Sequence, residues 1–161
     1  SRNNSIKYDN EENMNNVDVM MHNKYNLKAK LENYYYDIGI QAEICGPGIQ
    51  KNKLGLDDID MFVFNVYKVS DHKYLDYEDV IEVCRDLDLK PVPLVKKFIF
   101  DLPKENAITT LLNDVKGLYD GTKNRREGSV FRTVKETYSN VLKDRLSFKV
   151  LNNDYLIHDE D

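Results

Sequence analysis

The stretch Ile40–Lys53, IQAEICGPGIQKNK, followed by Met61–Val69, MFVFNVYKV, carries the clearest structural signal in the chain. Residues Ile40–Cys45 alternate apolar and polar side chains, which predicts a strand with one buried face. Gly46-Pro47-Gly48 predicts a turn, because glycine accepts positive φ and proline fixes its own φ. The apolar, β-branched run that follows predicts a second strand. We therefore expect two strands joined by a polar loop.

Four helices are predicted around these strands from apolar residues at helical spacing. We expect the first helix from Val17, with Met20 and Met21 in the core. The second begins after Asn26 as N-cap and continues to Gly39. The third begins after Asp76 and buries Val80, Val83, Cys84 and Leu87. The fourth runs from Ile108 through Leu118 and ends near Gly121.

Three further strands are predicted at Lys97–Phe100, Glu127–Val134 and Arg145–Leu151. The order of helices and strands is irregular and does not repeat a strand–helix–strand unit. This order favours an α+β fold with antiparallel sheets flanked by helices over a doubly wound parallel sheet. Because no internal linker or repeat interrupts the sequence, we expect residues 1–161 to form a single domain.

Composition narrows the class of protein. The chain has 161 residues, 23 Lys and Arg, and 28 Asp and Glu, which gives a net charge of −5. This charge argues against binding of nucleic acid by bulk positive charge, although a local basic groove stays possible. No apolar run has the length of a membrane span. The two cysteines, Cys45 and Cys84, favour a reducing compartment, and we expect a cytoplasmic protein.

Charged residues occur in three of the predicted strands. Glu43, Glu127 and Lys149 each lie among residues suited to burial on the opposite strand face. By alternation, Glu127 shares a face with Ser129 and Phe131. Such carboxylates and a lysine can line a polar cleft that holds a phosphate, a ribose hydroxyl or a divalent metal ion. Each charge taken alone is more typical of a solvated strand face.

Several of these stretches together resemble motifs of ATP-dependent, nick-sealing RNA ligases, which belong to the covalent nucleotidyltransferase superfamily. The resemblance lies in Glu43–Leu54 (EICGPGIQKNKL) and Met61–Tyr67 (MFVFNVY), which match the central motifs. Arg126–Arg132 (REGSVFR) is similar to motif IV, and Ser147–Leu156 (SFKVLNNDYL) to motif V of the bacterial branch. Ser1-Arg2-Asn3 is similar to the short motif that follows the nucleophile strand. The matches occur in the family's order and span nearly the whole chain.

The resemblance implies a role for individual residues. Arg2 would contact the ATP phosphates or the RNA 5′-phosphate end, and Glu43 would lie at the ribose of the adenylate. Phe64 would stack on adenine, and Glu127 would help to bind the divalent metal. Lys149 would contact the α-phosphate and stabilise charge as the phosphoanhydride breaks. Relatives often carry a second motif V lysine, where this chain has Ser147.

The resemblance also implies a reaction, its cofactors and its partners. We expect an adenylation-domain fold of the ligase type, unrelated to ATP-grasp, that joins RNA 3′-hydroxyl and 5′-phosphate ends. Enzyme–AMP and RNA–adenylate would be the intermediates, ATP (AMP) and Mg²⁺ or Mn²⁺ the cofactors, and RNA ends or a nicked duplex the partner. The family's nucleophile lysine lies in Lys-x-Asp-Gly, which does not occur here. We therefore expect a domain incomplete at its N-terminus, with a missing N-terminal segment of the same protein.

A second hypothesis belongs to a different class of protein. The chain would be a non-catalytic nucleotide- or RNA-binding module derived from a nucleotidyltransferase, without a nucleophile lysine. The run Lys123-Asn124-Arg125-Arg126 would then contact RNA phosphates. A basic run of this length is more often simply a solvated loop.

Overall fold

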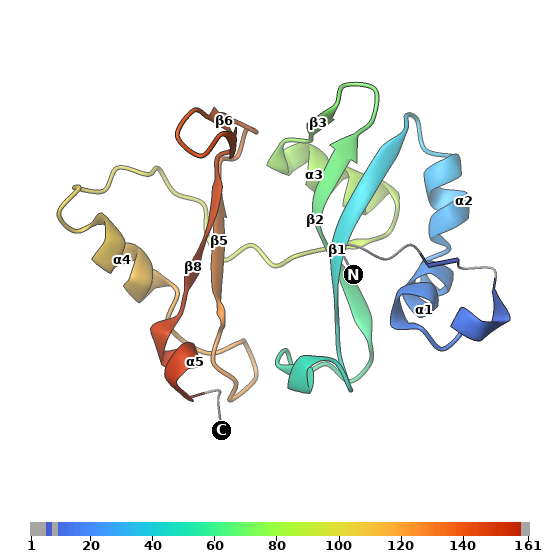
Figure 1. Ribbon diagram of the computed structural model, residues 1–161, viewed down its shortest axis with the longest axis horizontal. Helices are drawn as coiled ribbons and strands as arrows, with labels where there is room; N and C mark the ends of the chain where they lie inside the picture. The colour runs from blue at the N-terminus through green and yellow to red at the C-terminus, as the bar shows by residue number, and fades with distance from the viewer. Residues whose placement is uncertain (1–5, 8–9, 159–161) are drawn as a thin grey trace. The chain divides into compact units, whose positions relative to one another are not determined.

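The computed structural model describes residues 6–7 and 10–158, which form an α+β arrangement of helices and small sheets (Figure 1). The chain divides into two compact units: unit 1 is Ser1–Cys45 with Asp58–Val92, and unit 2 is Gly46–Asp57 with Pro93–Asp161. A compact unit is not by itself an independent domain, so the single domain over residues 1–161 stays a prediction.

Unit 1 is built around a four-stranded sheet. Two α-helices precede the sheet in the sequence, and a third lies between its last two strands. Its elements are η1 (Glu11–Asn13), α1 (Val17–Lys24), α2 (Leu27–Glu32), β1 (Ile38–Cys45), β2 (Asp60–Lys68), β3 (Lys73–Tyr74), α3 (Tyr77–Asp86) and β4 (Lys90–Pro91). Strand β2 pairs antiparallel with β1 and with β3, and parallel with β4. The predicted strands at 40–45 and 61–69 are therefore confirmed as a hairpin.

The core of unit 1 lies between this sheet and helix α3. Val63 and Val66 of β2 are fully buried, and Val83 and Cys84 of α3 are 1% exposed. Asp76 occupies the N-cap position of α3, as predicted. The apolar stripe of α3 therefore packs on the buried face of the sheet, which is the arrangement that its helical spacing favours.

Two predictions in unit 1 were wrong. Helix α2 ends at Glu32, and Ile38 and Gly39 belong to β1, because an isoleucine at helical spacing also fits the alternation of a strand. Met20 is 40% exposed, because the buried face of α1 is formed by Val19 and Met21. The short strand β4 after α3 was not predicted, and its pairing with β2 is parallel.

Unit 2 contains small sheets and short helices. Its elements are η2 (Gln50–Asn52), α4 (Ala107–Asp114), β5 (Gly128–Arg132), β6 (Tyr138–Ser139), β7 (Asp144–Arg145), β8 (Ser147–Leu151) and α5 (Asn153–His158). Strands β5 and β8 pair antiparallel, and so do β6 and β7. Val115, directly after α4, is fully buried, and the stacked rings of Phe131 and Phe148 join β5 to β8 at a centroid distance of 5.4 Å.

Two predictions in unit 2 were wrong. Helix α4 ends at Asp114, and Leu118 instead forms an isolated bridge with Arg125, because Gly117 interrupts the helical pattern with a φ of +118°. Residues 97–100, all of which the structure describes, form no strand. The Phe98 ring packs edge-on against the Phe131 ring, with a centroid distance of 6.1 Å. Side-chain packing therefore accounts for the apolar residue at position 98.

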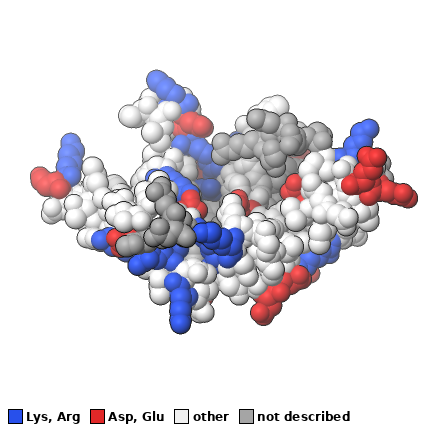
Figure 2. Space-filling model, turned by 60° about the horizontal axis from the view of Figure 1, so that its bottom comes forward, with Lys and Arg blue, Asp and Glu red and all other residues white. Residues whose placement is uncertain are grey.

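Charge divides unevenly between the two units. Unit 1 contains nine Lys and Arg against sixteen Asp and Glu, whereas unit 2 contains fourteen against twelve. The net charge of −5 is therefore the sum of an acidic unit and a slightly basic unit. On the face that Figure 2 shows, Lys and Arg gather over unit 2. None of the helices formed by the described residues has the length and apolarity that a bilayer crossing requires.

Candidate functional site

Two of the predicted site residues meet in unit 2, where the Lys149 Nζ donates a hydrogen bond to the Glu127 carboxylate. Lys149 lies in β8, directly opposite Val130, and Glu127 immediately precedes β5. The Lys149 and Glu127 side chains are 46% and 40% exposed. Solvent therefore screens the ion pair, which contributes at most about 1 kcal/mol to stability. The arrangement is suited to binding, because an accessible ammonium can contact a phosphate while the carboxylate binds a metal ion.

The position of Glu127 differs from the prediction made by strand alternation. Phe131, expected on the same face as Glu127, pairs with Phe148, whereas Lys149 pairs with Val130 on the other face. Glu127 nevertheless contacts Lys149. Strand β5 begins only after Glu127, so the alternation does not extend to this residue.

Gly128 allows β5 to approach β8 closely. A Cβ at this position would overlap the Val150 carbonyl oxygen and lie 3.0 Å from the Leu151 Cα. Its φ of +156° is also disfavoured for residues with a side chain. Only glycine fits here, so the Glu-Gly sequence of residues 127–128 combines a carboxylate with the residue that lets it reach the neighbouring strand.

Asn152 fixes the end of β8 to the beginning of β5, and sequence reasoning gave it no role. The residue is 1% exposed. Its side-chain Nδ2 donates to the Arg126 carbonyl at 2.8 Å, and its backbone N–H donates to the Glu127 carbonyl at 2.8 Å. Its Oδ1 accepts from the Asp154 N–H at 3.1 Å, as an N-cap of α5. The Asn-Asn-Asp run after an apolar strand was the available signal for this cap.

Arg126 is a structural residue of the same segment. Its Nη2 donates to the Lys116 carbonyl at 2.8 Å, and its backbone N–H donates to the Gly117 carbonyl at 2.9 Å. A Cβ at Gly117 would lie 2.9 Å from the Arg126 Nη2. The guanidinium is therefore committed to closing the loop before β5. Of the basic run at 123–126, the exposed cations are Lys123 and Arg125.

The other two described site residues lie in unit 1, on the β1–β2 pair. Glu43 is exposed and lies directly opposite Phe62. The register shifts between Gln41 and Ala42, which leaves Phe64 as the extra, unpaired residue of a β-bulge in β2. Bulges re-aim a side chain and are frequent next to active sites. Phe64 is partly exposed, whereas its neighbour Val63 is fully buried.

The predicted site residues are thus divided between the units. Glu43 and Phe64 share one strand pair, and Glu127 and Lys149 share an ion pair. Arg2 lies outside the described residues. The structure brings together two pairs of the predicted residues, each within its own unit.

The metal prediction depends on Glu127. The described residues contain no group of three or more His, Cys, Asp or Glu side chains placed to hold an ion. Mg²⁺ in enzymes that act on nucleotides is commonly held by one or two carboxylates together with substrate phosphates and water. The single accessible Glu127 carboxylate fits that manner of binding, in which the nucleotide supplies the remaining ligands.

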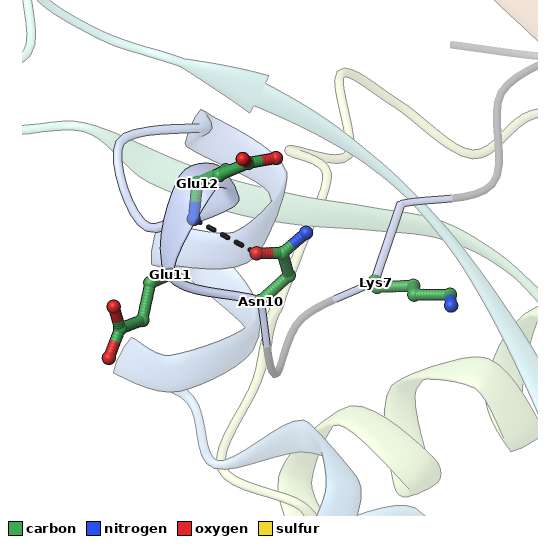
Figure 3. Close-up of a pocket in the computed structure, with 4 residues that line it drawn as sticks. All are labelled: Lys7, Asn10, Glu11 and Glu12. Atoms are coloured by element: carbon green, nitrogen blue, oxygen red, sulfur yellow. Dashed lines mark hydrogen bonds between the residues drawn. The ribbon is translucent and has the colours of Figure 1, made fainter.

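A shallow pocket in unit 1 contains none of the predicted site residues (Figure 3). It is lined by Lys7, Asn10, Glu11 and Glu12, and the Asn10 Oδ1 accepts from the Glu12 N–H at 3.1 Å as the N-cap of η1. Two carboxylates beside one lysine disfavour a phosphate ligand. We assign this pocket no role in nucleotide binding.

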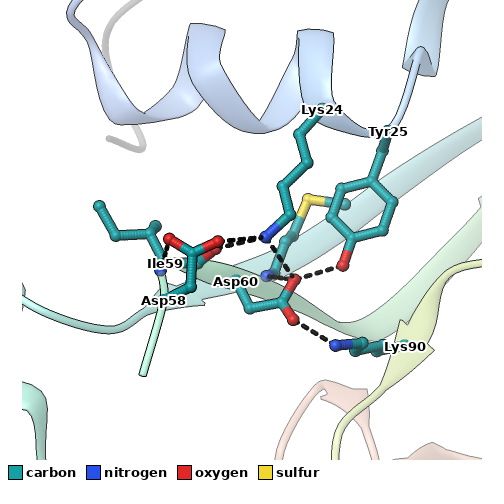
Figure 4. Close-up of polar contacts among 7 residues, drawn as sticks. Lys24, Tyr25, Asp58, Ile59, Asp60 and Lys90 are labelled. Carbon is teal, nitrogen blue, oxygen red and sulfur yellow. Dashed lines mark hydrogen bonds and ion pairs between the residues drawn. The ribbon is translucent and has the colours of Figure 1, made fainter. Parts of the chain in front are cut away.

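Unit 1 also contains a polar cluster around Asp60, at the beginning of β2 (Figure 4). Asp60 accepts hydrogen bonds from the Tyr25 hydroxyl and the Lys90 Nζ, and the Lys24 Nζ lies 3.7 Å from it. Burial by itself would raise the pKa of Asp60, but the bonds from Lys90, Tyr25 and the Met61 N–H outweigh it and lower the pKa to about 2. This carboxylate joins α1, β2 and β4, and its role is structural.

Comparison with known proteins gave one family. A family model described as RNA ligase matches residues 1–151. Among proteins with curated descriptions, none matches the chain significantly.

Solved structures with the same fold come from a Naegleria gruberi RNA ligase. The complex with PPi is 22% identical over 91% of this chain, with a TM-score of 0.75, and a variant with ATP and Mn is 21% identical over 91%, with a TM-score of 0.76. A further variant, with AMP and Mn, is 22% identical over 91%, with a TM-score of 0.74. At this identity the likeness shows the fold. The chain spans about two fifths of the length of these structures, 42%, 41% and 42% respectively.

Proposed function

The chain belongs to the RNA ligase family, and on that premise we propose that it forms part of an ATP-dependent adenylyltransferase that joins RNA 3′-hydroxyl and 5′-phosphate ends. The single observation that carries the proposal is the accessible ion pair between Lys149 and Glu127, because the two residues come from the two predicted motifs and meet in the structure. The likeness to structures that hold ATP or AMP with Mn supports the nucleotide and the metal as ligands.

The proposed reaction has three steps, in which every bond is exchanged at phosphorus. A lysine amine attacks the α-phosphorus of ATP, and pyrophosphate leaves with the electrons of the broken phosphoanhydride. An RNA 5′-phosphate oxygen then attacks the α-phosphorus of the lysyl-AMP and frees the lysine. Finally, the RNA 3′-hydroxyl attacks the activated 5′-phosphorus, and AMP leaves as the phosphodiester forms. No Lys-x-Asp-Gly occurs in residues 1–161, so the roles below concern binding and charge.

Lys149 would contact the α-phosphate in the first step. Negative charge moves onto the bridging and non-bridging oxygens as the phosphoanhydride breaks, and a nearby ammonium stabilises that charge. The Lys149 ammonium would be available to phosphate if Glu127 held the metal ion. Mg²⁺ or Mn²⁺, when bound through Glu127, would neutralise phosphate charge. Breaking the ion pair between Lys149 and Glu127 would cost little free energy, because the pair is exposed and therefore weak.

Phe64 and Glu43 would hold the nucleoside. The partly exposed phenyl ring of Phe64 would stack on adenine, and base–aromatic stacking contributes about 1–3 kcal/mol. The Glu43 carboxylate would accept a hydrogen bond from a ribose hydroxyl, which distinguishes a ribonucleotide at this point. Arg2 would contact the phosphates or the RNA 5′-end.

The test uses the protein encoded by the complete reading frame, incubated with α-labelled ATP and Mg²⁺. We expect AMP to become covalently attached, and we expect Lys149→Met to abolish the labelling while the folded structure is retained. Glu127→Gln should abolish the metal-dependent labelling. A folded protein that binds ATP without any covalent label would contradict the ligase and favour a non-catalytic nucleotide-binding module.

A further inference from the structure

Two loops of unit 2 that are distant in sequence lie against each other. One loop is residues 50–57, and the other is residues 116–126; we call them the paired loops. The Asn124 Nδ2 donates to the Lys53 carbonyl oxygen at 2.8 Å. A Cβ at Gly55 would lie 3.0 Å from the Thr122 Cγ2, which shows direct packing between the loops. The paired loops therefore form one continuous surface within unit 2.

Internal hydrogen bonds fix the shape of the first loop. The Asn52 side chain donates from Nδ2 to the Leu56 carbonyl at 2.8 Å and accepts at Oδ1 from the Leu56 N–H at 3.0 Å. These two hydrogen bonds close a loop in which Gln50, Lys51 and Asn52 all have positive φ. Because the backbone is held in this conformation, the Lys51 side chain projects from a preorganised support.

The second loop is fixed in a similar way. The Tyr119 N–H donates to the Asn124 carbonyl at 2.9 Å, and the Thr122 Oγ1 donates to the Tyr119 carbonyl at 2.9 Å. The Arg126 guanidinium closes the base of the loop through Lys116, as described above. Lys123 and Arg125, on either side of Asn124, are therefore presented by an ordered turn.

The paired loops carry cations that have no acidic partner. Lys51, Lys116, Lys123 and Arg125 are exposed, and within 6–7 and 10–158 no carboxylate lies at ion-pairing distance from them. Two other cations of unit 2 are paired, Lys96 with Asp114 and Arg145 with Glu136. Asp120 is the acidic residue of the second loop, and Asp57 that of the first. The paired loops contain six Lys and Arg against two Asp, whereas the rest of unit 2 contains eight against ten, so the net positive charge of unit 2 lies on the paired loops.

We propose that the paired loops bind the phosphate backbone of the RNA substrate. This inference rests on the proposed function and assigns the surface that holds RNA. Unpaired cations on a preorganised support release counterions when they contact successive phosphates, and such contacts position a nucleic acid without reading its sequence. The acidic unit 1, with sixteen Asp and Glu against nine Lys and Arg, repels the same backbone. Charge therefore directs RNA to unit 2, even though the whole chain is acidic.

The experiment measures binding of a fluorescein-labelled nicked RNA duplex by anisotropy at several NaCl concentrations. The test variant is Lys51→Asn, Lys123→Gln and Arg125→Gln together, in which asparagine is chosen because it tolerates positive φ. The matched control is Lys143→Asn, Lys104→Gln and Lys135→Gln. It removes the same charge from exposed residues of unit 2 outside the paired loops, and Lys143 also has positive φ.

We expect the test variant to bind RNA several-fold more weakly at low salt. Its slope of log K against log[NaCl] should fall by about 2–3, since each phosphate contact contributes about 0.9. The control should keep the slope of the unmodified protein. Equal losses in both variants, no loss in either, or no binding of RNA by the unmodified protein would each overturn the proposed surface.

A separate readout distinguishes this proposal from the proposed function. ATP affinity, and AMP labelling in the protein from the complete reading frame, should be unchanged in the test variant. If RNA binding follows the paired loops but no AMP is ever attached, the proposed ligase activity fails and the RNA surface stands. If labelling succeeds and the test variant binds RNA normally, only the surface is wrong.

Discussion

Gly128 and Val150 lie so close together across β5 and β8 that a Cβ atom at Gly128 would overlap the Val150 carbonyl oxygen. The carboxylate of Glu127 and the ammonium of Lys149 belong to the residues next to this contact. The approach of the two backbones is therefore a condition for the ion pair that the proposed function uses.

The first prediction concerns the close contact between β5 and β8 at Gly128. Gly128→Ala should destabilise the protein by more than about 3 kcal/mol, because the clash is with backbone atoms that cannot rotate away. Gly39→Ala in β1 is the matched control. Its new Cβ would lie 4.0 Å from the Tyr67 Cβ, and we expect a cost below about 1 kcal/mol. Urea unfolding monitored by circular dichroism measures both, and a Gly128→Ala protein as stable as the control would disprove the contact.

The second prediction separates stability from binding at Lys149. Lys149→Met should change the free energy of unfolding by less than about 1 kcal/mol, because the ion pair with Glu127 is exposed. The same variant should bind ATP more weakly, because the proposed phosphate contact is lost. Calorimetric titration with ATP and Mg²⁺ measures the affinity. Lys143→Asn is the control for removal of one positive charge, and equal ATP affinity in the Lys149→Met and unmodified proteins would remove Lys149 from the site.

The third prediction concerns the bulged residue Phe64. Phe64→Ala should weaken ATP binding by about 1–3 kcal/mol if its ring stacks on adenine. Phe62→Ala, on the same strand and also partly exposed, should leave the affinity within about twofold. Titration with ATP and with a non-aromatic anion such as pyrophosphate identifies the part of the ligand involved. A loss that is equal for both ligands would show that Phe64 supports the fold instead.

The fourth prediction concerns the stability of the protein at acid pH. The Asp60 carboxylate has its pKa lowered to about 2 in the folded protein, so its stabilisation is present above the unfolded pKa near 4. As the pH falls from about 4 through 2, this contribution of about 2 kcal/mol is lost. Asp60→Asn should be less stable at neutral pH and should show a smaller loss over that interval.

Hydrogen–deuterium exchange of peptides from β1 and β2 measures this effect locally. Asp37→Asn, at an exposed position just before β1, serves as the control and should behave like the unmodified protein. If the Asp60→Asn and unmodified proteins lost protection in parallel between pH 4 and 2, the role given to the Asp60 cluster would be wrong.

The sequence predicted those elements in which a single periodicity dominates. Strands β1 and β2 and helix α3 are present near the expected bounds, with Val83 and Cys84 buried as the helical spacing indicated. The prediction for α2 failed because Ile38 satisfies helical spacing as well as strand alternation, and local sequence does not separate the two. Strand β4 was missed because it is two residues long and depends on pairing with Phe62 and Val63.

For the candidate site, the residue types could be predicted from the sequence, but the contacts that position these residues could not. Glu127 and Lys149 are 22 positions apart, and their contact follows from the β5–β8 register. The bulge at Phe64 follows from the register against β1, and the burial of Asn152 from its bonds to Arg126 and Glu127. Each of these features is a relationship between distant segments, which a local pattern does not encode. The nucleotide and metal contacts stay predictions.

The loop that joins β1 to β2 belongs to unit 2, whereas the strands themselves belong to unit 1. Lys53, in this loop, precedes its hydrogen-bond partner Asn124 by 71 positions. During translation, β1 and β2 can therefore pair while the loop between them still lacks the segment it packs against. At roughly 5–20 residues per second, the loop emerges several seconds before that segment. The cationic surface is consequently assembled late in synthesis, and truncation between the two loops would leave a paired hairpin with an unsupported connection.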